Sequence, residues 1–316
     1  MSVPAAYLAV VLIWSTTPLA VKWSGEGPGF LFGVLGRMSL ATILCLALVA
    51  ALRLEFPWHR DARRAYSAGA LGVYAAMLLI YWAAQYVPSG LISVLFGLSP
   101  LVTTLLAAPL LGERTLTPAR FTGMVVALAG LVIIFGASLT SGPHMAAGLA
   151  ALCASVVLQS LSLVLIKRHA GPLPSLSVTA GALAIATPLF FLTWLVFDRH
   201  APAQLPTRAL ASIIYLGVIG SVLGFTLFFY VLKHVSAHGS ALITLITPVL
   251  ALLLGAAINH EHVGPRIWAG TALVLGGLAL HLWAGMLGRL ALAYNRGQRK
   301  DALSKSSFRR KPESSL

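Results

Sequence analysis

The sequence is built from ten apolar runs, each long enough to cross a lipid bilayer as a helix of about 20 residues. Clusters of glycine, proline and charged residues separate the runs. Because no water reaches the hydrocarbon core, each run has to satisfy its own backbone N–H and C=O groups, and a helix does this. The predicted spans are 3–21, 30–52, 66–86, 89–111, 118–138, 146–166, 175–197, 209–232, 237–258 and 266–287.

The composition excludes a soluble protein. Only 9% of the 316 residues are charged and 58% are apolar, with a mean hydropathy of +0.89. A soluble domain carries about 25% charged and 45–50% apolar residues, so this chain lacks the charge to cover a soluble surface. The alternating pattern of a membrane β-barrel is also absent. We therefore predict an all-α polytopic membrane protein with ten transmembrane helices, and the lipid bilayer is its first expected partner.

The positions of lysine and arginine predict the orientation. With a cytoplasmic N-terminus, nine of these residues fall in inner loops, eight in the tail from Arg289 onward, and four in outer loops. Positive residues favour the cytoplasmic side, so we predict a multi-pass plasma (inner) membrane protein with both termini in the cytoplasm. The net charge of +14 follows this pattern, and no nucleic acid partner is expected.

The two halves of the chain repeat each other at a shift of about 148 residues. The shift aligns small residues, a proline inside a span and a glutamate at a helix end. The pairs include Gly72 with Gly220, Pro100 with Pro248 and Glu113 with Glu261; a shift of 145 pairs Lys22 with Lys167.

Each half holds five spans, and an odd number inverts the second half in the membrane. Inverted repeats are typical of transporters, whose substrate sites lie between the repeats near the membrane midplane. We predict a first repeat at 1–138, a second, inverted repeat at 139–287 and a basic, disordered cytoplasmic tail at 288–316.

Part of the repeat resembles the EamA-type family of the drug/metabolite transporter superfamily. The segment Leu-Ser-Pro-Leu at 98–101 runs into Leu-Gly-Glu-Arg at 111–114, and Gly123 and Gly130 follow. The resemblance covers about residues 5–285. It implies the export or uptake of small metabolites, such as amino acids or drugs.

Three further residues, Trp14, Lys22 and Arg37, also resemble that family's pattern. The second repeat departs from it. His260-Glu261-His262 replaces Gly-Glu-Arg, and the seventh span has no counterpart of Arg37.

Polar side chains at helical spacing predict a central cavity between the repeats. Ser155, Gln159 and Ser162 share one face of the sixth span, and the ninth span carries a similar stripe. The repeat shift brings aromatic residues of other spans onto matching faces. The predicted pathway residues are Trp14, Thr17, Arg37, Tyr81, Phe96, Ser99, Gln159, Ser162, Phe229, Ser240, Thr244 and Thr247.

Structural roles compete with these assignments. Serine and threonine also bond back to their own helix or join neighbouring helices. An arginine eight residues into a span, such as Arg37, is a functional candidate, and it also fits a role in capping or snorkelling. Pro100 and Pro248 interrupt the helical hydrogen bonds, either as static kinks or as hinges.

Other functional classes lack their motifs. There is no G-x-x-x-x-G-K for ATP and no H-E-x-x-H for a catalytic metal, so we expect no enzyme, catalytic residue, metal or cofactor. No acid lies deep in a span, which argues against a buried carboxylate proton relay. We predict a secondary transporter that exports a small metabolite by alternating access. A flippase for a lipid-linked precursor is the alternative, and a homodimer is compatible with either function.

Overall fold

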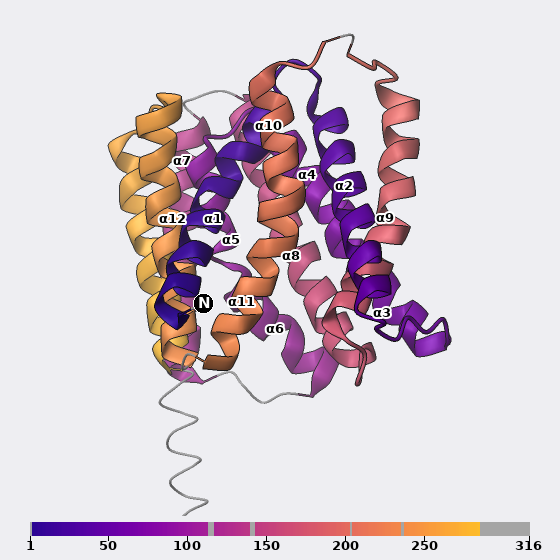
Figure 1. The fold of residues 1–316 in the computed structure, drawn as a ribbon. Helices are drawn as coiled ribbons and strands as arrows, with labels where there is room; N and C mark the ends of the chain where they lie inside the picture. The colour runs from indigo at the N-terminus through magenta and orange to yellow at the C-terminus, as the bar shows by residue number, and fades with distance from the viewer. Residues whose placement is uncertain (1, 113–116, 140–142, 203, 235–236, 285–316) are drawn as a thin grey trace, which may run out of the picture.

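The computed structural model describes residues 2–112, 117–139, 143–202, 204–234 and 237–284, and these residues form helices joined by short turns (Figure 1). Ten helices or helix combinations are long and apolar enough to cross a membrane. The elements are α1 (Val3–Ser24), α2 (Phe30–Ala51), α3 (Arg60–Ala70), η1 (Leu71–Ala76), α4 (Met77–Ala83), α5 (Ser89–Phe96), α6 (Ser99–Leu111), α7 (Pro118–Leu139), α8 (Pro143–His169), α9 (Ser175–Phe197), α10 (Thr207–Tyr215), η2 (Leu216–Leu223), α11 (Gly224–His234), α12 (Ala237–Asn259) and a last helix, Pro265–Ala284.

The predicted fold class is confirmed. The described residues form an all-α, multi-pass membrane protein with ten membrane-length spans, five in each half of the chain. The third span begins at Arg60, six residues before its predicted start. Its first turns are amphipathic, because arginines cover one face while Ala62, Ala65 and Tyr66 are buried on the other. Mean hydropathy therefore did not mark this start.

The fourth span is broken, whereas its counterpart in the second repeat is continuous. The α-helix α5 ends at Phe96, and α6 begins at Ser99 with Pro100 in its first turn. Proline lacks an N–H and its ring clashes with the carbonyl four residues earlier, so it lowers the cost of a break at this point. Pro248 lies inside the unbroken helix α12. The role of each proline as kink or hinge stays a prediction.

Each repeat contains a π-helical segment in its third span. The segment η1 covers Leu71–Ala76 and η2 covers Leu216–Leu223. Adding the repeat shift of 148 to 71–76 gives 219–224, which overlaps η2. π-helical turns are rare overall, and those that occur are often at functional sites. Their presence in the third span of both repeats makes this level of the two spans a candidate functional region.

Helix packing follows the repeat symmetry. The fourth and sixth spans pack through α6 and α8, and their counterparts, the ninth and first, pack through α12 and α1. The fifth and tenth spans cross at pairs of glycines: a Cβ on Gly123 would lie 2.6 Å from the carbonyl oxygen of Gly277. Such close approach is how membrane helices associate through small residues.

Adjacent glycines of the last helix test this crossing. A methyl group at Gly277 would meet the carbonyl oxygen of Gly123, whereas nothing lies within 4 Å of a Cβ at Gly276. We expect Gly277→Ala to lower the free energy of unfolding by about 1–3 kcal/mol, because overpacking forces the helices apart. Gly276→Ala is the matched control and should be neutral or slightly stabilising. Thermal unfolding in detergent measures both, and equal stability of the two variants would contradict the crossing.

Candidate functional site

A buried ion pair joins the two repeats at one end of the molecule. Lys22, in the last turn of α1, donates from Nζ to Glu261 Oε1 at 3.0 Å, and the Glu261 side chain is only 6% exposed. Asn259 Nδ2 donates to the same oxygen at 2.9 Å. Ser89 donates to Oε2 from both its backbone N–H (2.8 Å) and its hydroxyl (2.9 Å). Both carboxylate oxygens are thus occupied, which is the condition for burying a charge at acceptable cost.

The backbone after α12 turns back to bring Glu261 into this position. His260 adopts a left-handed conformation (φ 51°), and the Glu261 N–H donates to the carbonyl of Gly255 at 3.1 Å. A Cβ on Gly255 would lie 2.5 Å from Glu261 Oε2. Glycine at 255 therefore leaves the space in which the carboxylate lies.

Further polar groups extend the network across the same end. Trp23 Nε1 and Arg208 Nη2 both donate to Asn259 Oδ1, at 2.9 and 3.1 Å. The Arg208 guanidinium lies over the Trp23 ring at 3.9 Å from its centroid. A half-exposed ion pair of 3.6 Å connects Arg208 with Glu26. We call Lys22, Trp23, Ser89, Arg208, Asn259 and Glu261 the Glu261 cluster. Its members come from α1 and α5 of the first repeat, and from α10, α12 and the turn after α12 of the second.

A pocket of about 660 Å³ opens beside the Glu261 cluster. Lys22, Glu261, His262 and Arg266 supply its polar lining, and Tyr86 and Met145 are among its apolar residues. Water at this end can therefore reach one side of the ion pair.

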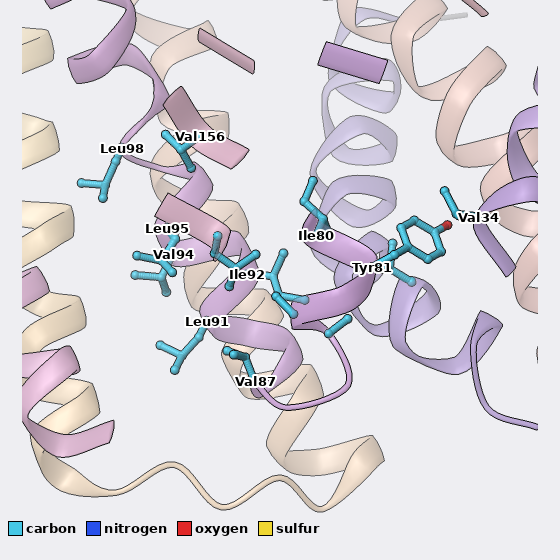
Figure 2. Close-up of a cluster of buried hydrophobic side chains, with 14 of the residues drawn as sticks. Val34, Ile80, Tyr81, Val87, Leu91, Ile92, Val94, Leu95, Leu98 and Val156 are labelled. Carbon is cyan, nitrogen blue, oxygen red and sulfur yellow. The ribbon is translucent and has the colours of Figure 1, made fainter. Parts of the chain in front are cut away.

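Apolar side chains around α5 pack next to the Glu261 cluster, on the side of the membrane interior. Figure 2 shows the buried side chains around α5, where Leu91, Leu95 and Leu98 pack in one core with Val156 of α8. A Cβ on Gly90 would lie 2.5 Å from the Cα of Leu252, so α5 and α12 are in close contact at this end.

The fourth span moves away from α12 toward the other end. Beyond the break after Phe96, α6 follows α8, while α12 follows α1. Within the described residues, α6 has no packing with α12 comparable to that of α5, and Figure 1 shows the chain diverging from α12 along α5 and α6. The first and second repeats are therefore joined through α5 and α12 at the Glu261 end, whereas α6 and α12 diverge toward the opposite end.

Three predicted pathway residues have buried polar atoms without a partner. Tyr81 Oη, Ser99 Oγ and Gln159 Oε1 have no hydrogen-bond partner within the described part of the chain. An unpaired buried polar group costs about 1–3 kcal/mol. A substrate or water that bonds to these atoms would remove that cost.

The serines of the predicted α8 stripe have packing roles in this structure. Ser162 Oγ donates to the carbonyl of Ala68 at 2.7 Å, and Ser155 Oγ donates to that of Ala76 at 2.9 Å. Both bonds join α8 to the third span: Ala68 lies just before η1, and Ala76 is the last residue of η1. Ser162 therefore uses its hydroxyl between helices, and its pathway role stays a prediction.

The other predicted residues are spread over both repeats. Trp14 lies against Phe228 with ring centroids 4.6 Å apart. Thr17 Oγ1 donates to the carbonyl of Ile13 in its own helix. Phe96 and Thr244 are half-buried and Thr247 is buried. The helices α11 and α12 contain Phe229 and Ser240, whose side chains lie outside the described part of the structure, as does the tail 288–316.

Arg37 is 5% exposed and is bound to the π-helical segment of the other repeat. Its Nε and Nη2 atoms donate to Ser221 Oγ, both at 3.4 Å, and Ser221 in turn donates to the carbonyl of Leu216 at 2.9 Å. Within the described residues no carboxylate lies within ion-pair distance of Arg37. A buried guanidinium whose described partner is a single hydroxyl retains donors for an anionic group.

The comparisons with known proteins identify the family. The model described as the EamA-like transporter family matches residues 3–136 and 146–283. The chain belongs to the EamA-like transporter family. Members of the family are transporters and not enzymes, so this EamA-like protein is a membrane transporter.

Individual relatives agree with the family. A probable terminal-alkyne amino-acid exporter of Streptantibioticus cattleyicolor is 29% identical over 277 residues, which cover 87% of this chain and 91% of the exporter. An uncharacterized protein of Pseudomonas aeruginosa is 33% identical over 81% of this chain and 83% of its own length. A solved crystal structure at 24% identity has a TM-score of 0.61 over 90% of this EamA-like chain and 98% of that chain, which supports the fold.

Removing the Glu261 charge should open the closed end. Glu261→Gln leaves Lys22 without its counter-charge, and losing a charged hydrogen bond costs about 1–3 kcal/mol. In a Cys45→Ser/Cys153→Ser background, a reporter cysteine at the buried position Val21 should then react roughly tenfold faster with a membrane-impermeant maleimide. Glu26→Gln is the control, because its half-exposed ion pair contributes little. If both variants react at the parent rate, the Glu261 cluster does not hold this end closed.

Proposed function

We propose that this transporter exports a small, amino-acid-like metabolite across the plasma membrane by alternating access, with both termini in the cytoplasm. The observation that carries the proposal is the Glu261 cluster, which closes one end of the interface between the repeats while α6 and α12 separate toward the other. In the predicted orientation the closed end faces outward, so the structure corresponds to an inward-facing state.

The difference between the two repeats supports this mechanism. The span α5–α6 is broken after Phe96, while its counterpart α12 is continuous. Alternating access between inverted repeats requires equivalent spans to hold different conformations and to exchange them. In the outward-facing state α5–α6 would straighten and α12 would bend near Leu245, the position equivalent to Gly97. Residues 1–138 and 139–287 would be the two units that exchange conformation.

The outer closure would open by hydration of the ion pair. Lys22 remains 24% exposed at its side chain, and the pocket of about 660 Å³ already reaches it. Separating a partly solvated pair costs less than separating one in a dry interior. A substrate that arrives from the cytoplasmic side would need to supply only the free energy that separates this partly solvated ion pair.

The proposed substrate class rests on Arg37 and on one relative. A guanidinium binds a carboxylate through paired, charge-assisted hydrogen bonds, and Arg37 lies between the repeats against η2. The relative from Streptantibioticus cattleyicolor bears the name of an amino-acid exporter. The name of this relative does not point to the alternative, a lipid-precursor flippase.

Arg37 provides the transport test. Inverted vesicles that contain the protein should accumulate labelled zwitterionic amino acids, and Arg37→Gln should reduce the rate at least tenfold, because a charged hydrogen bond contributes about 1.5–3 kcal/mol. Arg53→Gln removes an exposed arginine just beyond α2 and should leave the rate unchanged. Monodispersity and thermal stability in detergent show whether each variant is folded.

Two results would overturn the proposal. If Arg37→Gln keeps its transport rate and loses thermal stability, then Arg37 has a structural role and the carboxylate-bearing substrate loses its structural support. If vesicles move a lipid-linked sugar and no amino acid, the flippase is the correct function.

The orientation has its own test. Reporter fusions after Arg64 and Lys167 should be active as cytoplasmic markers, and a fusion after Pro202 should be active as an external marker, because the positive residues gather on one side. A cytoplasmic signal at Pro202 would reverse the proposed direction of transport.

A further inference from the structure

A groove with one charged end and one apolar end lies between α3 and α8. Its volume is about 620 Å³. Arg60, Arg63, Arg64 and His169 form the charged end, and Leu71 and Leu165 lie among the apolar residues farther along the same helices.

The arginines of this groove carry more positive charge than the protein balances. Asp61 pairs with Arg64 at 3.4 Å, and both side chains are largely exposed. No ion pair with a carboxylate involves Arg60 or Arg63 in the described part of the chain. All three arginines occupy the first turns of α3, where the helix dipole disfavours cations. An anion bound here would relieve both the charge repulsion and the unfavourable dipole interaction.

Aromatic residues next to α3 mark the level of the lipid headgroups. Phe56 and Trp58 are exposed, at 37% and 56%, although Phe56 stacks on Tyr66 and Trp58 contacts the same ring at a tilt. Exposed aromatic residues at the ends of spans are typical of the membrane–water interface. The arginines begin two residues after Trp58, and so they lie at headgroup depth.

The apolar end lies within one leaflet of the bilayer. Leu71 is eleven residues beyond Arg60 in a continuous helix, which corresponds to about 16 Å along the helix axis. This is close to half of the roughly 30 Å hydrocarbon thickness. The groove therefore runs from the headgroups toward the membrane centre.

We propose that this groove binds an anionic phospholipid, with its phosphate among Arg60, Arg63 and Arg64 and an acyl chain against Leu71 and Leu165. Guanidinium groups bind phosphate oxygens in bidentate fashion, and basic pockets between spans are known as sites for anionic headgroups. A soluble phosphate would use only the arginines and leave the apolar end uncovered. The bound lipid would connect α3 to α8, the two helices that the Ser162–Ala68 hydrogen bond also joins.

Photo-crosslinking tests the site in the intact protein. The protein is reconstituted in phosphatidylcholine nanodiscs with a small fraction of phosphatidylglycerol that carries a photoactivatable acyl chain. We expect crosslinks on the peptides that contain Leu71 and Leu165. The double variant Arg60→Gln/Arg63→Gln should lower the crosslinked fraction at least tenfold, because each basic residue contributes appreciably to anionic lipid binding.

A matched variant and two competitors decide the outcome. Arg53→Gln/Arg168→Gln removes the same charge from exposed positions outside the groove and should leave the crosslinked fraction unchanged. Unlabelled phosphatidylglycerol should displace the probe, whereas inorganic phosphate should not. Equal losses in both double variants would show diffuse surface attraction and overturn the proposal. Full displacement by inorganic phosphate would show a site for a soluble anion, and equal labelling by a photoactivatable phosphatidylcholine would show no selectivity for an anionic headgroup; either result also overturns it.

Discussion

The ion pair between Lys22 and Glu261 holds the two repeats together at one end, and the arrangement of the spans around it depends on that contact. A lone glutamate at this level, 6% exposed, would carry a large desolvation cost. Here four donor atoms from three residues surround its two oxygens, so the charge is stabilised only when α1, α5 and the end of α12 meet. Breaking that meeting leaves two charged groups without their partners. The cluster therefore links the position of the helices directly to the state of a single carboxylate.

The absence of water in the bilayer explains the remaining polar contacts. Serines and threonines inside the spans bond to backbone carbonyls, as Ser162 does with Ala68 and Thr17 does with Ile13. Against this background, the unpartnered atoms of Tyr81, Ser99 and Gln159 are unusual. The same physics explains why Arg37 is bonded to the hydroxyl of Ser221, since a bare guanidinium at this depth would be costly.

The sequence predicted the architecture well, because hydropathy and the repeat shift depend only on residues close in sequence or in fixed register. It did not indicate the Glu261 cluster, because the contacts of this cluster join positions that are distant in the sequence. Lys22 and Glu261 each stood out as repeat-matched residues, but they are 239 residues apart and no pattern indicated that they pair. Ser89 and Asn259 are ordinary polar residues at helix ends and gave no signal. Ser221 lies in η2, whose π-helical period differs from the α-helical spacing on which the predicted polar faces depend.

The fourth span is broken and the ninth is continuous, so equivalent spans of the two repeats adopt different conformations in one structure. Repeats of common origin would be expected to fold alike, and in the third and eighth spans they do, since both contain a π-helical segment. The break after Phe96 has no equivalent in α12, although Pro100 and Pro248 occupy matching positions in the sequence. The difference therefore does not come from the prolines alone. It arises from the surroundings: α5 is held against α12 by the close approach at Gly90 and by the bonds of Ser89 to Glu261, while α6 packs on α8. A span that is attached to different partners at its two ends has to bend between them, and proline lowers the cost of bending at that point.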